Sequence, residues 1–505
     1  MARLLTLLLI MVATAVTGSA EDKTHRSPRM ASGDITSERA VIWGQIDARA
    51  EMEVEYSLDS HFTDSNRVQG PVVDESSDFS GQVELQNLAS ATRYFYRILF
   101  REHAGQPADG SLMSATGTFQ TAPLSTVPVP VSFVFSGDLG GQGFCRHSVD
   151  GYRIFSAMLE RSPDFFVENG DFIYADGTCP AQGPAGRSNV PGTFAGISDG
   201  GVDWMDRTAV RTLYRDHWRY QLEDGHLSEF LRHVPLYAQW DDHEVINDAG
   251  WGWDYWNSDS RTRAGFENLV AAGREAFFQH LPIRRNSADP QQIYRLYQWG
   301  KDLDLILLDG RSYRSRNDAP DGLGKTLLGS RQLAWLKDTL AHSQATWKIV
   351  SADVPLSVPT GSKFGRDAWA NGDSIEPGAR TGFEYELLDL MRFLDDHQVK
   401  NVVFLAADVH FAAQLRYSID PNGDGNPLII HELIAGPLAA MRRQAPSPGF
   451  DSTLHPTVLY TEGGLFNFGY VRTARQADGS AHLIAQVYDD RGERRPGATL
   501  DLTPQ

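Results

Sequence analysis

The chain has 505 residues, of which 41% are hydrophobic and 22% charged, so its composition is that of a globular protein long enough for more than one domain. Its formal net charge of −19 at pH 7 argues against nucleic acid or an anionic membrane as a partner, because binding to phosphate groups relies on lysine and arginine. A phosphate-bearing substrate would therefore need a local positive centre, which a bound metal could supply.

Residues 1–20 are predicted to be a secretory signal peptide. Arg3 supplies a short basic region, residues 4–13 form an apolar core, and the small residues 18–20 resemble a cleavage site. The alternative, a membrane anchor, is disfavoured because the apolar stretch is short for a membrane span and small residues follow it. We expect the mature chain to begin near Glu21, in the periplasm or outside the cell, and no later stretch approaches transmembrane length.

Residues 27–122 have the pattern of a small β-sandwich. Short runs of alternating apolar and polar residues, such as "RAVIWGQI", "EMEVEYSL" and "TRYFYRILF", are separated by turn residues, and no helix-length amphipathic segment interrupts them. The proline-containing segment "TAPLSTVPVP" follows, and it predicts a domain boundary near residue 127.

From residue 127 to residue 505, apolar strands alternate with amphipathic helices. Hydrophobic residues recur at three- and four-residue spacing in the segments 149–161, 206–222, 262–281, 330–343 and 382–398, which predicts helices there. The intervening apolar runs predict strands, and this alternation is typical of an α/β fold with largely buried sheets flanked by helices. The segment 465–493 returns to hairpin-like strands that should complete those sheets.

Five of the predicted strands end in an aspartate. They read "VSFVFSGD", "DFFVENGD", "PLYAQWDD", "WKIVSAD" and "VVFLAAD", and they end at Asp138, Asp171, Asp242, Asp353 and Asp408. Ligands of α/β sheets gather beyond the carboxyl ends of the strands, so we expect these side chains at one rim. Burying several carboxylates together is costly unless they are paired, protonated or bound to metal.

Two nearby residues extend this acidic set. Tyr174 follows Asp171 at i+3, and a phenolate suits only a strongly Lewis-acidic ion such as Fe3+, because a free phenol has a pKa of about 10. His410 follows Asp408 at i+2, which would place both side chains on the same face if the strand continues. Taken singly, these residues are more typical of turns, packing or capping, but together the oxygen-rich set favours hard cations.

The order of the segments "GDLG", "GDFIYAD", "WDDHEVIND", "SADVPLS" and "AADVHF" resembles the calcineurin-like metallophosphoesterases, and more closely the alkaline phosphatase D (PhoD-like) family, whose members also carry an N-terminal β-domain. The resemblance spans most of the mature chain. It implies a metallophosphoesterase-type α/β sandwich, with two mixed β-sheets flanked by helices, after a small all-β sandwich domain. Purple acid phosphatases share the "GDxxY" element, with the tyrosine on ferric iron.

The resemblance implies a binuclear metal centre. The first ion, with Fe3+ expected, would be held by Asp138, Asp171, Tyr174 and His410, and Asp171 would bridge to the second ion. The second site would be completed by Asp242, Asp353 and Asp408, whose oxygens suit Ca2+; Zn2+, Mn2+ and Mg2+ are alternatives. Asn247 would be a further oxygen ligand or a donor to the substrate.

Two departures accompany this resemblance. Characterised members of the family often have a cysteine ligand after the first strand, where this chain has Asp138, and the N-terminus carries no twin-arginine signal. Cys145 and Cys179 are the only cysteines of the chain. An even number in an oxidising compartment favours a disulfide between them, and a metal thiolate at Cys145 is the alternative.

His243 and Arg311 are the candidates for catalysis and substrate binding. His243 beside Asp242 matches the dipeptide that, in the superfamily, protonates the leaving group or stabilises its charge; otherwise it is a structural histidine bonded to Glu244. Arg311 follows an apolar strand in "LLDGRSYR", so its guanidinium would either bind substrate phosphate or pair with Asp309.

Two further segments have alternative interpretations. The aromatic-rich segment 250–259, "GWGWDYWNSD", is either a pocket wall that favours bulky alcohols or a packed loop. The segment 420–426, "DPNGDGN", has the opening spacing of an EF-hand loop. Position twelve is His431 rather than glutamate, and a strand precedes the segment, which favours a hairpin turn.

The predicted function is that of a secreted metal-dependent phosphoric ester hydrolase, an alkaline phosphatase, a phosphodiesterase or both, whose binuclear centre activates water. Its substrate would be a phosphate monoester or diester, and phospholipase-D-like cleavage of phospholipids is an alternative. An alternative of another class is a non-enzymatic calcium-binding adhesion module, which gives no reason for His243 or Tyr174 at the rim. We expect a monomer.

Overall fold

The computed structural model of this chain describes residues 28–102, 112–249, 262–362, 365–373, 376 and 378–505. The predicted signal peptide at residues 1–20 and the aromatic-rich segment 250–259 lie outside these ranges. Within them, none of the helices combines the length and the apolar character that crossing a membrane requires.

The N-terminal region is built almost entirely from strands. Its elements are β1 Arg29–Gly33, β2 Ala40–Gln45, β3 Ala50–Ser57, β4 Ser65–Val73, the short 3-10 helix η1 Glu75–Ser77, β5 Ser80–Leu85, β6 Arg93–Glu102, β7 Leu112–Met113 and β8 Gly117–Gln120. The alternating runs of the sequence correspond to β2, β3, β5, β6 and β8. Strand β4 was not predicted, because it contains a Gly-Pro pair that usually ends a strand and is mostly exposed.

The remaining strands begin after the proline-containing segment. They are β9 Ser132–Ser136, β10 Phe165–Glu168, β11 Leu236–Ala238, β12 Arg295–Trp299, β13 Leu303–Leu307, β14 Trp347–Ser351, β15 Gly361–Ser362, β16 Gly365–Arg366, β17 Val402–Ala406, β18 Ala412–Ile419, β19 Leu428–Ile434, β20 Thr457–Glu462, β21 Asn467–Arg475, β22 Ala481–Asp489 and β23 Arg494–Leu502. Strands β18 and β19 pair antiparallel from Ile419 and Leu428, so the "DPNGDGN" segment is a hairpin turn, as predicted.

Six α-helices lie in the described part of the chain. They are α1 Ile154–Leu159, α2 Arg207–Leu222, α3 Gly225–His233, α4 Arg263–His280, α5 Gly329–His342 and α6 Glu384–Asp396, with a further 3-10 helix η2 Pro184–Gly186. Five of them fall in the predicted segments. Helix α3 was not predicted, because it is short and follows α2 after a break at Asp224, whose carboxylate caps it by accepting from the Leu227 amide.

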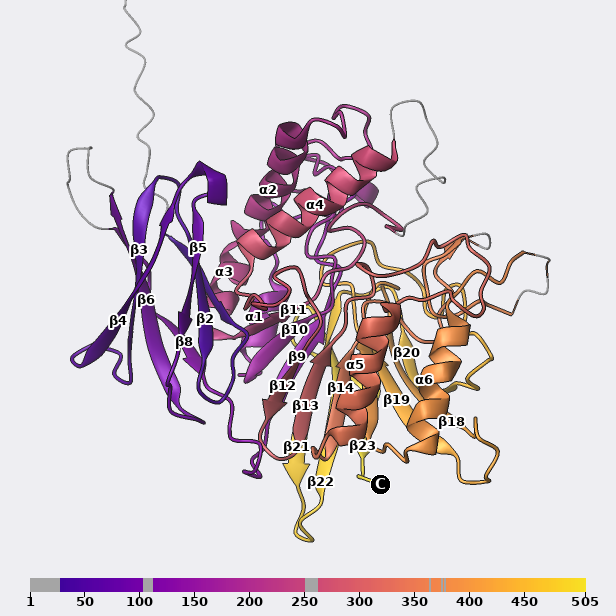
Figure 1. Ribbon diagram of the computed structural model, residues 1–505. Coiled ribbons are helices and arrows are strands. Elements are labelled where there is room, and N and C mark those ends of the chain that lie inside the picture. The colour runs from indigo at the N-terminus through magenta and orange to yellow at the C-terminus, as the bar shows by residue number, and fades with distance from the viewer. Residues whose placement is uncertain (1–27, 103–111, 250–261, 363–364, 374–375, 377) are drawn as a thin grey trace, which may run out of the picture.

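These strands form two large mixed sheets. One has nine strands in the order β23-β22-β21-β9-β10-β11-β1-β2-β5, and the other has seven in the order β12-β13-β14-β17-β19-β18-β20. Helices α1 to α4 pack on one face of the nine-stranded sheet, and α5 and α6 pack on one face of the seven-stranded sheet (Figure 1). The prediction of two mixed sheets flanked by helices is confirmed.

Apolar side chains fill three layers between these elements. Phe133 and Phe135 of β9 point into the core shared by the two sheets, where they join Trp347 and Leu405. Val134, between them, points into the core beneath α1 to α4. Burial on both faces explains why these strands read as continuous apolar runs rather than as alternating ones.

The N-terminal region shares main-chain hydrogen bonds with the rest of the chain. Strands β3, β4, β6 and β7 form a five-stranded sheet with β8, whereas β1, β2 and β5 belong to the nine-stranded sheet. The junction is the parallel pair of β1 and β11, with Gly33 opposite Leu236. The sheet therefore continues across the boundary predicted near residue 127.

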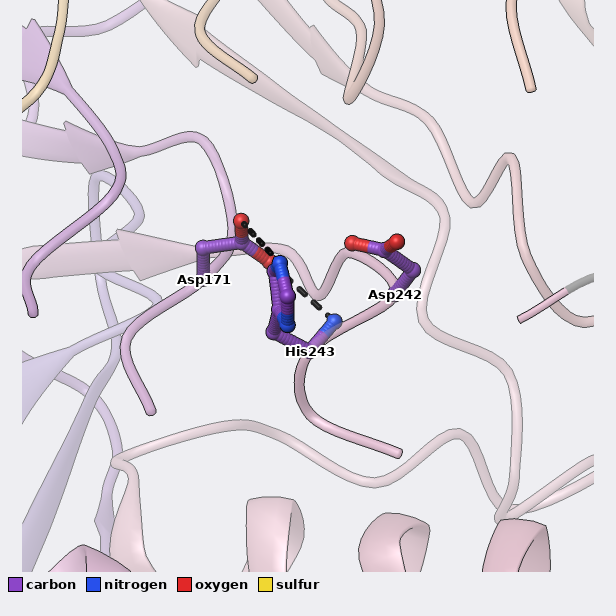
Figure 2. A group of neighbouring side chains, drawn as sticks. All are labelled: Asp171, Asp242 and His243. Atoms are coloured by element: carbon purple, nitrogen blue, oxygen red, sulfur yellow. Dashed lines mark hydrogen bonds and ion pairs between the residues drawn. The ribbon is translucent and has the colours of Figure 1, made fainter. Parts of the chain in front are cut away.

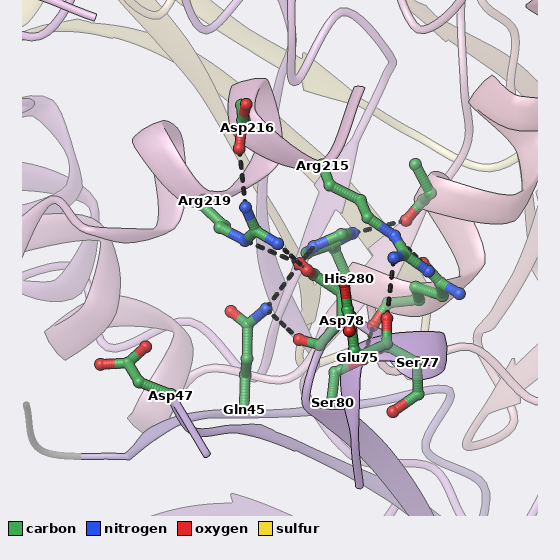
Figure 3. Close-up of polar contacts among 12 residues, drawn as sticks. Gln45, Asp47, Glu75, Ser77, Asp78, Ser80, Arg215, Asp216, Arg219 and His280 are labelled. Atoms are coloured by element: carbon green, nitrogen blue, oxygen red, sulfur yellow. Dashed lines mark hydrogen bonds and ion pairs between the residues drawn. The ribbon is translucent and has the colours of Figure 1, made fainter. Parts of the chain in front are cut away.

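Polar contacts hold the segment that contains η1 against α2 and α4 (Figure 3). The buried carboxylate of Asp78 lies 2.9 Å from Nε2 of His280, and it accepts from Nε of Arg219 at 3.0 Å. Arg215 donates to the carbonyl oxygens of Glu75 and Ser76 at 2.9 and 2.6 Å. The N-terminal region is therefore fixed to the two helices that cover the nine-stranded sheet.

Candidate metal centre

The carboxyl ends of the central parallel strands meet at one rim of the two sheets. Strands β9, β10 and β11 are parallel neighbours in the nine-stranded sheet, and β13, β14 and β17 are parallel neighbours in the seven-stranded sheet. The predicted ligands follow five of these strands directly, in the loops that begin after Ser136, Glu168, Ala238, Ser351 and Ala406. The rim thus collects side chains from segments far apart in the sequence.

The backbone at this rim turns in the left-handed region. Asp138, Asp171, Asp408 and His410 have φ angles of 59°, 59°, 62° and 60°. Aspartate and histidine are enriched among the non-glycine residues that adopt this conformation. The expectation that Asp408 and His410 share the face of a continuing strand is wrong, because β17 ends at Ala406; a loop with two left-handed residues positions them instead.

Asp138, Tyr174 and His410 form a buried inner group. Nε2 of His410 lies 3.1 Å from the hydroxyl of Tyr174 and 3.6 Å from Oδ1 of Asp138. The other ring nitrogen, Nδ1, contacts the carbonyl oxygen of Met441, and a carbonyl only accepts, so Nδ1 carries the proton. Burial lowers the pKa of His410 to about 3, which leaves Nε2 with a free lone pair, as a metal ligand requires.

Asp171, Asp242 and His243 form a second group beside the first (Figure 2). One ligand atom of each lies within 4.8 Å of the others. They open onto a pocket of about 430 Å³ whose walls also carry Asn247, Asp408 and His410. Most of the predicted ligands, together with Asn247, therefore surround one space.

Several carboxylate oxygens of this site are buried without a hydrogen-bond partner. Among the described residues these include both oxygens of Asp138 and one each of Asp242 and Asp408. Burial raises the pKa of Asp138 to about 7 and, together with nearby carboxylates, raises the pKa of Asp171 and Asp408 well above the ordinary range. Bound cations would satisfy these oxygens and offset the repulsion, so the residues fit a metal centre with hard ligands.

Tyr174 supports the same conclusion. Burial and the negative charges of Asp171 and Asp138 raise the pKa of its phenol well above 10. The side chain would therefore be a phenolate only in the presence of a strongly Lewis-acidic cation. Its ring stacks on that of His243 with centroids 4.0 Å apart, so the position of the phenol is fixed by packing.

His243 pairs with Asp176 rather than with Glu244. Its Nδ1 atom lies 2.6 Å from Oδ1 of Asp176. Burial alone would lower the pKa of His243, but the charges of Asp176 and Asp242 outweigh it and raise the pKa to about 10. Glu244 instead accepts from backbone amides of two ligand loops, those of Asp171 at 3.0 Å and Asp241 at 2.7 Å. It fixes the two loops relative to each other.

Arg311 and Asp353 lie deeper than the pocket. The guanidinium of Arg311 pairs with Asp353 at 3.3 Å and Asp367 at 2.7 Å, and it also contacts Asp241. Only its backbone amide, and not its side chain, bonds Asp309. The predicted side-chain pairing with Asp309 is therefore wrong, and the guanidinium is surrounded by the buried carboxylates of Asp241, Asp353 and Asp367.

Three acidic residues of the site were not singled out from the sequence. Asp176 orients His243. Asp248 and Asp367 form a third group with Asp242, in which one ligand atom of each residue lies within 4.8 Å of the others. Asp176 is the last residue of "GDFIYAD" and Asp248 is the last residue of "WDDHEVIND". Both could have been predicted as site residues because they adjoin predicted ligands. Asp367 lies outside every quoted motif and carried no signal.

A disulfide joins Cys145 and Cys179 across 34 residues of sequence. Cys145 is therefore not available as a metal thiolate. The bridge links the loops that follow β9 and β10, and the segment it closes contains Asp171 and Tyr174.

Comparisons with known proteins agree with this geometry. The profile of the PhoD-like phosphatase family matches residues 134–477, and that of the PhoD-like phosphatase N-terminal domain matches residues 13–123. Alkaline phosphatase D of Bacillus subtilis (strain 168) is 25% identical over 416 residues, which are 75% of this chain and 64% of that protein. The chain thus spans less than two thirds of the length of this relative.

Two solved structures share the fold. The structure of PhoD superposes with a TM-score of 0.68 at 19% identity, covering 94% of this chain and 92% of that one. The purple acid phosphatase PPD1 from yellow lupin (Lupinus luteus) seeds superposes with a TM-score of 0.56 at 13% identity, covering 94% of this chain and 74% of that one. Since the first family profile alone covers more than half of the sequence, the chain belongs to the PhoD-like phosphatase family.

Proposed function

We propose that this protein is an exported metal-dependent phosphoric ester hydrolase, an alkaline phosphatase, a phosphodiesterase or both, with a binuclear metal centre. The observation that carries this proposal is the group of buried carboxylate oxygens without a hydrogen-bond partner on Asp138, Asp242 and Asp408, of which the last two line one pocket together with His243 and His410. Such oxygens need cations, and a substrate with phosphate oxygens needs a positive centre in a chain with a formal net charge of −19.

In this proposal the first ion is held by Asp138, Asp171, Tyr174 and His410, and the second by Asp171, Asp242, Asp353 and Asp408. The phenol and the imidazole favour Fe3+ in the first site, and the carboxylates favour Ca2+ in the second, with Zn2+, Mn2+ or Mg2+ as alternatives. When bound, such cations lower the pKa of water and neutralise charge on a phosphoryl group.

The protein's own groups then orient the substrate and move a proton. His243 donates from Nε2 to the leaving alcohol oxygen, while Asp176 holds Nδ1 and keeps the imidazole charged. The Asn247 side chain, on the pocket wall, binds an ester or phosphate oxygen. Arg311 compensates the charge of Asp353 and Asp367 beneath the site and holds their carboxylates in place.

Two observations support export. The first residues have the pattern of a signal peptide, and the disulfide between Cys145 and Cys179 is typical of an oxidising compartment. Export would also place the loading of metal outside the cytoplasm.

The test is to purify the exported protein, measure its bound metals, and assay p-nitrophenyl phosphate and bis(p-nitrophenyl) phosphate. Asp171→Asn should lose both metals and activity, because its carboxylate is proposed to bridge them. Asp338→Asn is the matched control and should keep both, because Asp338 is an exposed aspartate on α5 that does not line the pocket. Full turnover by Asp171→Asn would overturn the bridging assignment.

A further inference from the structure

The pocket in front of the ligand groups has a strongly acidic lining. Asp171, Asp242, Asp248 and Asp408 contribute carboxylates to its walls. Arg311 lies behind the pocket and is occupied by carboxylates. Among the described residues that line this pocket, Arg443 is the one arginine or lysine.

The main chain holds Arg443 at a fixed place beside the ligand loop. Its amide donates to the carbonyl oxygen of His410 at 3.1 Å, and its own carbonyl oxygen accepts from the amide of Gly464 at 2.8 Å. The residue is exposed, and no side chain that the structure describes pairs with its guanidinium. The backbone of this residue is thus anchored, while its guanidinium has no side-chain partner among the described residues.

Arg443 lies beside the inner ligand group. Its amide is hydrogen-bonded to His410, and both residues line the same pocket as Asp408. An anion that enters the pocket therefore meets this guanidinium close to the groups proposed to hold metal. A guanidinium presents several N–H donors in a planar fork that matches the oxygens of phosphate.

The neighbouring arginine provides a contrast. The guanidinium of Arg442 lies over the ring of Phe466 at 4.8 Å from its centroid and donates to the carbonyl oxygen of Gly464 at 3.4 Å. Arg442 is also exposed, but it does not line the pocket. Two adjacent arginines in one loop thus differ: Arg442 packs on Phe466, and Arg443 lines the pocket.

We infer that Arg443 binds the terminal phosphate oxygens of the substrate and favours phosphomonoesters over phosphodiesters, an inference that rests on the proposed hydrolase function. At neutral and alkaline pH a monoester is a dianion with three terminal oxygens, whereas a diester is a monoanion with two. An arginine that lines an acidic pocket therefore adds more binding energy to the monoester.

The test compares wild type with R443A, R443K and R442A on p-nitrophenyl phosphate, bis(p-nitrophenyl) phosphate and inorganic phosphate as a competitive inhibitor. R443A should lower kcat/KM for the monoester roughly 10- to 100-fold and weaken inhibition by phosphate to a similar degree, as expected for the loss of a charged hydrogen bond. The diester should change by less than about threefold, because its single charge depends less on the arginine.

The two other variants separate charge from structure. R443K keeps the charge without the planar fork and should recover part of the lost monoester activity. R442A should match wild type on both esters, and all variants should keep the metal content of wild type. Equal losses on both esters, or no loss on the monoester, would overturn the inference.

The outcome also separates this inference from the proposed function. If the metal-loaded wild type hydrolyses neither ester, the hydrolase proposal fails. Calorimetric titration of wild type and R443A with inorganic phosphate would still decide the role of Arg443: equal affinities would contradict it, and a loss of roughly tenfold or more would support it.

Discussion

The Nδ1 atom of His243 lies 2.6 Å from Oδ1 of Asp176, and both side chains are almost fully buried. An ionised carboxylate only accepts, so Nδ1 carries a proton and Nε2 is the atom turned toward Asp171, 4.0 Å away. Because the pKa of His243 is raised to about 10, Nε2 is protonated as well at neutral pH. The pair therefore keeps a proton available at the pocket.

Asp176→Asn should reduce the activity most at alkaline pH. The charge of Asp176 raises the pKa of His243, so its removal lets that pKa fall, and the protonated imidazole is lost at lower pH. We expect the alkaline limb of the kcat profile to move from near pH 10 toward neutrality, with metal content unchanged. His243→Ala should cost about 10²–10⁴-fold in kcat and remove that limb. An Asp176→Asn profile identical to wild type would contradict this role.

Tyr174→Phe should remove a visible absorption band of the metal-loaded protein and lower its iron content. A phenolate bound to Fe3+ absorbs visible light, and phenylalanine offers no ligand oxygen. The ring packing on His243 should survive, because the phenyl ring fills the same space. The matched control is Tyr152→Phe, another buried tyrosine, whose hydroxyl donates to Gln221. A band that persists in Tyr174→Phe but not in wild-type apoprotein would assign the colour to another ligand.

The positions of the candidate ligands could be predicted from the sequence because each follows an apolar strand. A run such as "NVVFLAADVHF" shows both the buried strand and the polar residues at its end, and the α/β pattern places those ends at one rim. The same local logic predicted five helices and the hairpin turn at 420–426. The apolar pattern did not predict the backbone conformation of Asp408 and His410, because left-handed residues in a loop have no characteristic apolar spacing.

Relationships between distant segments could not be predicted in this way. The parallel pairing of β1 with β11 joins Gly33 and Leu236, which are about 200 residues apart. Nothing in the sequence near either residue indicates that the two strands pair. Arg311 was visible as a cation after a strand, but its partners Asp353 and Asp367 come from other loops. Whether an arginine binds substrate or neutralises buried acids is decided by three-dimensional burial, which a single sequence does not display.

Asp78→Asn should destabilise the protein by about 1–3 kcal/mol, because Arg219 and His280 would lose their common carboxylate. Asparagine tolerates the left-handed backbone of this position, where φ is 57°, so the effect reports the charge rather than strain. Asp47→Asn is the control in the same region (Figure 3). Its carboxylate is about half exposed, and its contact with Arg29 is long, at 3.4 Å. Equal unfolding temperatures for the two variants would contradict the importance of this contact.

Replacement of Cys145 and Cys179 by serine should cost about 3 kcal/mol of stability, because the bridge closes a loop that would otherwise be free in the unfolded chain. The closed segment contains Asp171 and Tyr174, so the double variant should also bind metal more weakly. Thermal unfolding with and without reductant checks this: reductant should destabilise wild type and leave the variant unchanged. The same unfolding temperature for wild type with and without reductant would contradict this stabilisation.

Glu432→Gln should stabilise the protein at alkaline pH. Glu432 is fully buried in β19, where it accepts from the hydroxyl of Tyr417 at 2.5 Å and from the amide of Leu356 at 2.7 Å. Burial raises its pKa from 4.5 to about 7, so between these values the folded chain holds a proton that the unfolded chain has released. The stability contributed by this group is therefore present below about pH 4.5 and is lost as the pH rises through 7.

Glutamine keeps an acceptor for the amide of Leu356 but cannot ionise, so the variant should gain roughly 2–3 kcal/mol over wild type between pH 5 and pH 8.5. Differential scanning calorimetry of both proteins at the two pH values measures this difference. Glu267→Gln, on the exposed side of α4, controls for the loss of one negative charge and should show no such dependence. If the stability difference between Glu432→Gln and wild type were the same at both pH values, Glu432 would have to remain in one protonation state throughout, and burial would not be what sets its titration.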